Sequence, residues 1–354
     1  MVTAVDGRVA GSLARGKLVY RWDLDKTYLR TDFDTVRALL RTAFEPARRK
    51  RTVPGAAPLI RELRSTDPAG IYILSGSPEQ MRKVLETKLR LDGVRWDSFT
   101  LKPSLANMLR GRFRYLHDNV GYKLGALFES RRDLAPDLDE VMFGDDAEAD
   151  AFIYSLYADV CAGKVPEDGL IAILERSGVH AADIPRIVQL ASQIERRDFC
   201  RRIFIRLDRV SSPEAFDGFG QRVCPFFNYF QPALVLLEMG ALDAAAALRV
   251  AAELVINHGF SSDALTASYE ELARRGRLGR RAADSLKAAS RGLGQGDFVS
   301  AAPALEAFCR EIPQATHGLA SLPPPGRGQI DYLAVLASDR ARAKDAKRRV
   351  LRRH

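Results

Sequence analysis

The sequence predicts an α/β fold, a Rossmann-like parallel sheet, joined to a second and mostly helical domain. Over residues 17–165, short apolar runs alternate with stretches of helical spacing. Strands that alternate with helices pair in parallel through crossover connections. From about residue 166 the composition stays helical, with no convincing strand run, so we expect the sheet to end there. The expected division is a 1–16 extension, the 17–165 α/β domain, a 166–322 helical domain of unknown role, and a 323–354 linker and basic tail.

Four apolar runs have the length and composition of strands, and most of them end in polar residues. The expected strands are 18–22, 71–74, 96–101 and 140–143. Helical spacing lies between and after them, at 35–44, 57–65, 79–91, 123–132, 170–177, 183–196, 233–257, 263–275 and 282–290. Ligands of parallel sheets bind outside the carboxyl ends of the strands, so the polar residues at these ends are the candidate site.

Composition favours a globular, cytoplasmic protein. The chain has 354 residues, 46% of them apolar, and a mean hydropathy of −0.17. Its most apolar region, 232–256, carries charges at helical intervals, which is typical of amphipathic helices and not of a membrane span. The four cysteines show no zinc-site spacing, so we expect free thiols in a reducing compartment.

The net charge of +9 predicts attraction to anions such as phosphates, anionic lipid or nucleic acid. Residues 340–354 hold eight Lys/Arg against one Asp. That tail is either a contact for an anionic membrane surface or nucleic acid, or a frayed helix end. No aromatic residues alternate with its charges, so nucleic acid is not favoured. A second basic run, 48–51, is either a solvated charged loop or, as the family resemblance given below would imply, part of a small cap.

Asp23 and Asp25 follow the first predicted strand and are the most informative pair in the chain. Two acids at one strand end are costly unless a cation joins them, and a hard divalent ion is the usual partner. Thr27 can hydrogen-bond within the same turn.

Three further pieces follow in order, each next to a predicted strand or helix. Ser75 ends the second strand in a turn with Gly76 and Ser77, whose backbone N–H groups can face an anion. Lys123 is expected to open a helix. Asp145 ends a later strand, with Asp146, Glu148 and Asp150 close behind.

These residue types fit phosphoryl transfer. A carboxylate can attack phosphorus and form an aspartyl-phosphate, while a second carboxylate moves the proton. A serine hydroxyl and a lysine ammonium can stabilise the phosphoryl oxygens. Further acids complete an oxygen-rich site that suits Mg²⁺.

In its four ordered motifs the sequence resembles the haloacid dehalogenase superfamily of phosphohydrolases. Residues 75–78, 101–103 and 143–154 narrow the likeness to the catalytic domain of lipin-like and actin-patch-type phosphatidate phosphatases. The resemblance covers roughly residues 17–160 and implies a haloacid dehalogenase-like fold. One departure is Lys26, at a position where those enzymes often carry another acid.

The resemblance also implies roles for individual residues. Asp23 would be the nucleophile and Asp25 the general acid/base. The phosphate would be bound by Ser75, Gly76 and Lys123, with Lys102 as the rival lysine. Mg²⁺ would be bound by Asp23, the Asp25 carbonyl and Asp145, assisted by Asp146 or Asp150.

We therefore expect a Mg²⁺-dependent phosphomonoester hydrolase that acts through an aspartyl-phosphate, with phosphatidate or a related phospholipid as the leading substrate. Two alternatives stay open. One is a non-catalytic, phosphatase-like binding or scaffold protein, and the other is a nucleic-acid end phosphatase.

Overall fold

The structure is a computed structural model, and it describes residues 16–30, 46–103, 115–208, 211–294, 296–315 and 328–338. Several expectations fall outside these ranges. They are the helix at 35–44, most of the linker at 323–328, and the basic tail at 340–354.

A six-stranded parallel sheet forms the centre of the molecule, with the strand order β3-β2-β1-β4-β5-β6. This confirms the predicted α/β class. The strands are β1 Leu18–Trp22, β2 Gly70–Pro78, β3 Ser98–Lys102, β4 Asp139–Asp145, β5 Cys200–Arg206 and β6 Val223–Phe226. All five residues of β1 are buried, because β1 is an inner strand with helices on both faces.

The expectation that no strand follows residue 166 was wrong, because β5 and β6 continue the sheet. Arg201 and Arg202 interrupt the apolar pattern of β5, yet both are engaged: Arg201 Nε donates to Asp139 Oδ2 (2.7 Å) and Arg202 Nη1 donates to the Gln221 carbonyl (2.6 Å). β6 is only four residues long and contains Pro225, which an edge strand tolerates. The purely helical part therefore begins after β6.

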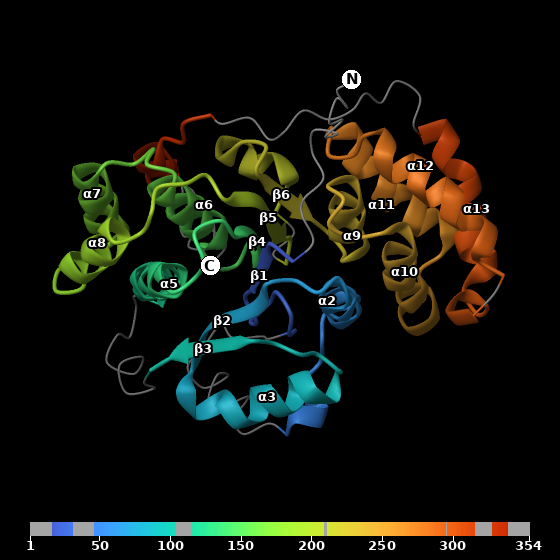
Figure 1. The fold of residues 1–354 in the computed structure, drawn as a ribbon, viewed down its shortest axis with the longest axis horizontal. Helices are drawn as coiled ribbons and strands as arrows, with labels where there is room; N and C mark the ends of the chain where they lie inside the picture. Colours follow the sequence, from blue (N-terminus) through green and yellow to red (C-terminus); the bar gives the residue numbers. More distant parts are fainter. Residues whose placement is uncertain are drawn as a thin grey trace, which may run out of the picture.

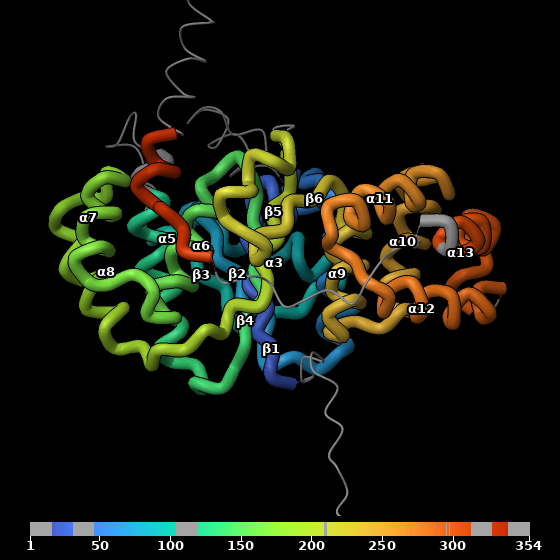
Figure 2. The backbone as a smooth tube through the Cα atoms, turned by 90° about the horizontal axis from the view of Figure 1, so that it is seen from above, coloured from blue at the N-terminus to red at the C-terminus, as the bar shows by residue number. Residues whose placement is uncertain are grey.

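Helices cover both faces of the sheet (Figure 1). The chain runs from β1 to β3 in one direction and from β4 to β6 in the other, so right-handed crossovers place the two sets of helices on opposite faces. On one side of the sheet the apolar core includes α2 Ala56–Ser65, α3 Arg82–Leu91, α9 Phe230–Glu238 and α10 Ala244–His258, and further helices pack onto α9 and α10: α11 Ser262–Arg274, α12 Arg280–Ala289 and α13 Ala302–Ala315. The other packs α5 Tyr115–Arg132, α6 Asp150–Cys161, α7 Glu167–Ser177 and α8 Ile184–Ser192. Figure 2 shows α9–α13 gathered at one end of the molecule and α7 and α8 at the other.

Two predicted helices differ most from the observed ones. Lys123 lies two turns inside α5 and does not open it, because the helix begins at Tyr115. The 233–257 stretch is two helices, since Gly240 takes a left-handed φ of 75° and Asp243 caps α10 by accepting from the Ala246 N–H (2.8 Å).

A continuous apolar core joins the sheet to the helices that follow β6. The Trp22 ring stacks on Phe143 with 3.9 Å between centroids, and Tyr229 stacks on the same Trp22 at 5.7 Å. All four cysteines are free and buried, as expected. Among the described residues, no helix is both long and apolar enough to cross a membrane.

A buried ion network around Glu140 connects β1 and β4 with α5 and α6. Glu140 of β4 accepts from Arg21 Nε (2.7 Å) and Nη2 (3.0 Å), and from Tyr157 OH (3.1 Å). Arg131 Nη1 lies 3.4 Å from the same carboxylate. Two buried guanidinium groups thus depend on one carboxylate for their charge balance.

Glu140→Ala is therefore expected to lower the free energy of unfolding by about 3–5 kcal/mol, because both arginines would stay buried without their counter-ion. Urea unfolding measures this change. Glu62→Ala breaks the half-exposed pair with Arg249 and should cost about 1 kcal/mol or less. If both variants lost the same free energy of unfolding, Glu140 would not be the counter-ion on which the two buried arginines depend.

Candidate active site

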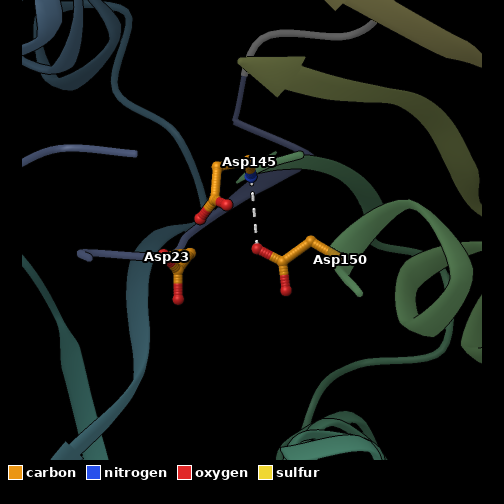
Figure 3. A group of neighbouring side chains, drawn as sticks. All are labelled: Asp23, Asp145 and Asp150. Carbon is orange, nitrogen blue, oxygen red and sulfur yellow. Dashed lines mark hydrogen bonds between the residues drawn. The ribbon is translucent and has the colours of Figure 1, made fainter. Parts of the chain in front are cut away.

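Three aspartates converge at the carboxyl edge of the sheet (Figure 3). Asp23 follows β1, Asp145 ends β4 and Asp150 begins α6, and one carboxylate oxygen of each lies within 4.8 Å of the other two. β1 and β4 are neighbours in register, Trp22 opposite Phe143, so their ends meet at this point. All three side chains are fully buried.

Lys123 supplies the positive charge among these acids. Its Nζ lies 2.9 Å from Asp23 Oδ1, 2.5 Å from Asp150 Oδ1 and 2.8 Å from Glu148 Oε2. Burial alone would lower the pKa of Lys123, but the three carboxylates together raise it well above its usual value. The lysine is therefore a permanent ammonium.

The carboxylates outnumber their cation, and the pKa of each of the three aspartates is raised, chiefly by burial. Burial, opposed by Lys123, raises the pKa of Asp23 well above its usual value. Burial and the nearby Asp150 do the same to the pKa of Asp145, and burial raises that of Asp150 to about 6. The excess negative charge marks a place where a further cation is stabilised.

Asp145 is oriented by the turn that follows it. Its Oδ1 accepts from the backbone N–H groups of Ala147 (2.6 Å) and Glu148 (2.9 Å), and Thr27 Oγ1 lies 3.4 Å from its Oδ2. The preceding Gly144 leaves room for Asp150, because a Cβ built there would lie 2.5 Å from Asp150 Oδ2. Glycine is thus needed for the close approach of the two chain segments.

Asp25 is hydrogen-bonded to two serines of β2, Ser75 and Ser77. Its Oδ2 accepts from Ser75 Oγ (3.0 Å) and from Ser77 Oγ (2.7 Å), and Ser75 Oγ also accepts from the Ser77 N–H (3.0 Å). Burial and the charge of Glu148 raise the pKa of Asp25, against the two serine hydrogen bonds. The expectation that Ser75 ends the strand in a turn was wrong, because β2 continues to Pro78. Within the strand, the spacing of two places Ser75 and Ser77 on one face.

Of the remaining predicted residues, Lys102 and Gly76 lie close to Asn119, and Asp146 is not part of the three-aspartate group. Lys102 Nζ reaches Asn119 Oδ1 (3.5 Å), and Asn119 Nδ2 reaches Glu148 Oε2 (3.4 Å), so Asn119 links Lys102 to one of the acids that contact Lys123. Gly76 also packs on this amide, since a Cβ there would be 3.3 Å from Asn119 Oδ1. Asp146 is not brought to the three aspartates: its Oδ1 accepts from the Asp208 N–H (2.8 Å).

Two residues from later in the chain, at the end of β5 and just before α9, hold the loop that carries Asp23 and Asp25. Arg206, at the end of β5, donates to the Lys26 carbonyl, and Tyr229 OH donates to the Thr27 carbonyl (2.6 Å). Lys26 itself has a left-handed φ of 60°. These contacts were missed from the sequence, because Arg206 belongs to the unpredicted strand β5 and Tyr229 lies 202 positions from Thr27.

The donor set fits a hard divalent cation. Among the buried side-chain oxygens of the described residues, Asp23 Oδ2 and Asp25 Oδ1 have no hydrogen-bond partner. A buried carboxylate oxygen without a donor is expensive, and a cation bound by Asp23, Asp145 and Asp150 would satisfy it.

Comparison with known proteins agrees with this chemistry. Residues 22–167 match the family model of the catalytic domain of phosphatidate phosphatase APP1. The match identifies this part of the chain as a phosphatase domain, a hydrolase, and supports the resemblance to phosphatidate phosphatase-type enzymes. The wider haloacid dehalogenase assignment stays a prediction. No curated protein and no solved structure matches the chain significantly.

Gly144→Ala is expected to displace the Asp150 carboxylate and to lower phosphatase activity roughly a hundredfold, because catalysis is sensitive to shifts of about 1 Å. The turnover of a generic phosphomonoester measures the loss. Gly218→Ala is the matched control, since a Cβ there meets nothing within 4 Å. Activity unchanged in Gly144→Ala would show that Asp150 need not lie where it does.

Tyr229→Phe removes the hydrogen bond to the loop carbonyl of Thr27, so kcat should fall several-fold and the free energy of unfolding by about 1 kcal/mol. Tyr269→Phe serves as the control, because the buried Tyr269 hydroxyl has no partner among the described residues. Equal effects of the two changes on kcat would argue against a role in positioning the loop.

Proposed function

We propose that this phosphatase domain is a metal-dependent phosphomonoester hydrolase that acts through an aspartyl-phosphate on Asp23. The observation that carries the proposal is the state of the Asp23 carboxylate. Its Oδ1 is bound by Lys123, while its buried Oδ2 has no hydrogen-bond partner among the described residues. Lys123 thus orients the carboxylate while one of its oxygens stays without a hydrogen bond, so the group can both bind a cation and attack phosphorus.

In the first step, an Asp23 oxygen forms a bond to phosphorus as the ester oxygen departs. Asp25 gives that leaving oxygen a proton. The raised pKa of Asp25 supports this role, because burial favours the protonated form from which a general acid starts.

In the second step, Asp25 accepts a proton from water, and the water oxygen displaces Asp23 from phosphorus. Inorganic phosphate leaves and both carboxyl groups return to their first states. The serine hydroxyls of Ser75 and Ser77 keep Asp25 oriented through both proton transfers.

Charge on the phosphoryl oxygens needs cations nearby. Lys123 provides one within the aspartate cluster. A Mg²⁺ ion bound by Asp23, Asp145 and Asp150 would supply the remaining positive charge and offset the repulsion between carboxylates and phosphate.

Phosphatidate or a related phospholipid is the proposed substrate. The match at residues 22–167 to a phosphatidate phosphatase catalytic domain supports it. The net charge of +9 is compatible with an anionic membrane surface, and four free buried cysteines support a cytoplasmic location. The same charge would also suit a nucleic-acid end, so oligonucleotide 5′- and 3′-phosphates belong in the substrate screen.

Asp23→Asn is expected to lower turnover of phosphatidate in mixed micelles by roughly a thousandfold or more, since the nucleophile is lost. Asp25→Asn should lower it by about a hundredfold to ten-thousandfold, the usual contribution of a general acid/base. Asp146→Asn makes the same chemical change beside the site and should keep most of the activity. Full activity in Asp23→Asn would refute the aspartyl-phosphate route, and a wild-type protein without any turnover would favour the phosphatase-like binding protein.

Removal of divalent metal with EDTA is expected to abolish activity, and added Mg²⁺ should restore it. Mg²⁺ should also raise the melting temperature of the wild-type protein, because it binds only the folded arrangement of the three aspartates. Asp145→Asn should reduce that rise. Full turnover in excess chelator would exclude the metal-dependent proposal.

A further inference from the structure

A cavity separate from the aspartate cluster lies on the side of the sheet that carries α2, α3 and α10. Its volume is about 440 Å³. The start of α2, the ends of α3 and α10, and the chain segments around Arg30 and 50–55 form its walls. It contains none of the aspartates of the candidate active site.

The walls of this cavity are positively charged. Five lysines and arginines line it, against two acids, Asp92 and Glu253; the basic residues are Arg30, Lys50, Arg51, Arg61 and Lys88. Asp92 is already neutralised, because its Oδ1 accepts from Lys88 Nζ (2.7 Å) and its Oδ2 from Tyr28 OH and Thr52 Oγ1 (2.6 Å each). Within the described part of the chain, no carboxylate forms an ion pair with Arg30, Arg51 or Arg61.

The start of α2 adds to this charge. Gly55 caps the helix with a φ of 81° and without a side-chain hydrogen bond, and the first turn holds no acid. Gly55 and Ala57 line the cavity, so the positive end of the helix dipole acts on its contents. The position of Gly55 is set by close packing, since a Cβ there would lie 2.8 Å from Tyr229 Cβ.

The walls are held in place by contacts between separate elements. Leu29 pairs with Thr52 in an antiparallel bridge, and the Arg30 N–H donates to the Arg51 carbonyl (2.8 Å). Arg249 of α10 forms a two-pronged pair with Glu62 of α2, at 2.8 and 2.7 Å. A site with fixed walls loses less entropy when a ligand binds.

We propose that this cavity is a second anion site, which binds a phosphate-bearing group apart from the Asp23 centre. Arginine forks match the oxygens of a phosphate, and the cavity is lined by three arginines, Arg30, Arg51 and Arg61, that form no ion pair with an acid of the described residues. The volume exceeds that of phosphate alone, so the site accepts a phosphate on a larger group, either a lipid headgroup or a soluble phosphomonoester.

The test measures phosphate binding to the full-length protein in EDTA at fixed ionic strength. Without metal, the carboxylates around Lys123 repel phosphate from the candidate active site, so titration calorimetry with inorganic phosphate reports on the cavity. The double variant Arg51→Gln/Arg61→Gln should weaken binding by roughly tenfold or more. The control Arg132→Gln/Arg186→Gln removes the same charge from exposed positions on the opposite face and should bind as the wild type does.

A second arm distinguishes the source of the phosphate by co-sedimentation with vesicles of phosphatidylcholine alone or with phosphatidate. Loss of phosphatidate-dependent sedimentation in the cavity variant alone identifies a lipid headgroup. Weaker titration with unchanged sedimentation identifies a soluble phosphate compound. The proposal is overturned if the cavity variant matches its control in both arms, or if the wild type binds neither probe.

Discussion

The ion contacts of Lys123 are the constraint on which the rest of the structure depends. A fully buried ammonium on α5 touches Asp23, which follows β1, and Glu148 and Asp150, which lie at the start of α6. Burying so many charges is costly unless they are paired and hydrogen-bonded. The arrangement therefore requires β1, α5 and α6 to meet within a few ångströms, and the parallel sheet is the scaffold that brings them there.

Part of the candidate active site could be predicted from the sequence. Asp23, Ser75 and Asp145 were expected to meet because each follows a strand of a parallel sheet, and the structure places all three at one edge. Lys123 was expected near them as well, although at the start of a helix. It lies inside α5, so helical spacing alone identified the element but not its first residue.

The rest depended on contacts between residues far apart in the chain. Arg206 and Tyr229 contact the loop after β1 across about two hundred positions, and no local pattern marks them. β5 was missed because Arg201 and Arg202 look like surface residues, whereas Arg201 pairs with Asp139 and Arg202 donates to the Gln221 carbonyl. The side chain of Asp146 was equally unpredictable, since adjacent acids in one turn point in different directions.

The position of β4 inside the sheet has a practical consequence for anyone who divides this chain. β5 pairs with β4 along its whole length, from Glu140 to Asp145, yet β5 lies beyond residue 167. A recombinant fragment cut at that point would turn β4 into an open edge, with a row of unpaired amides next to an apolar surface. Such edges pair with other molecules. Insolubility of the short fragment would then reflect its missing neighbour and say nothing about its chemistry.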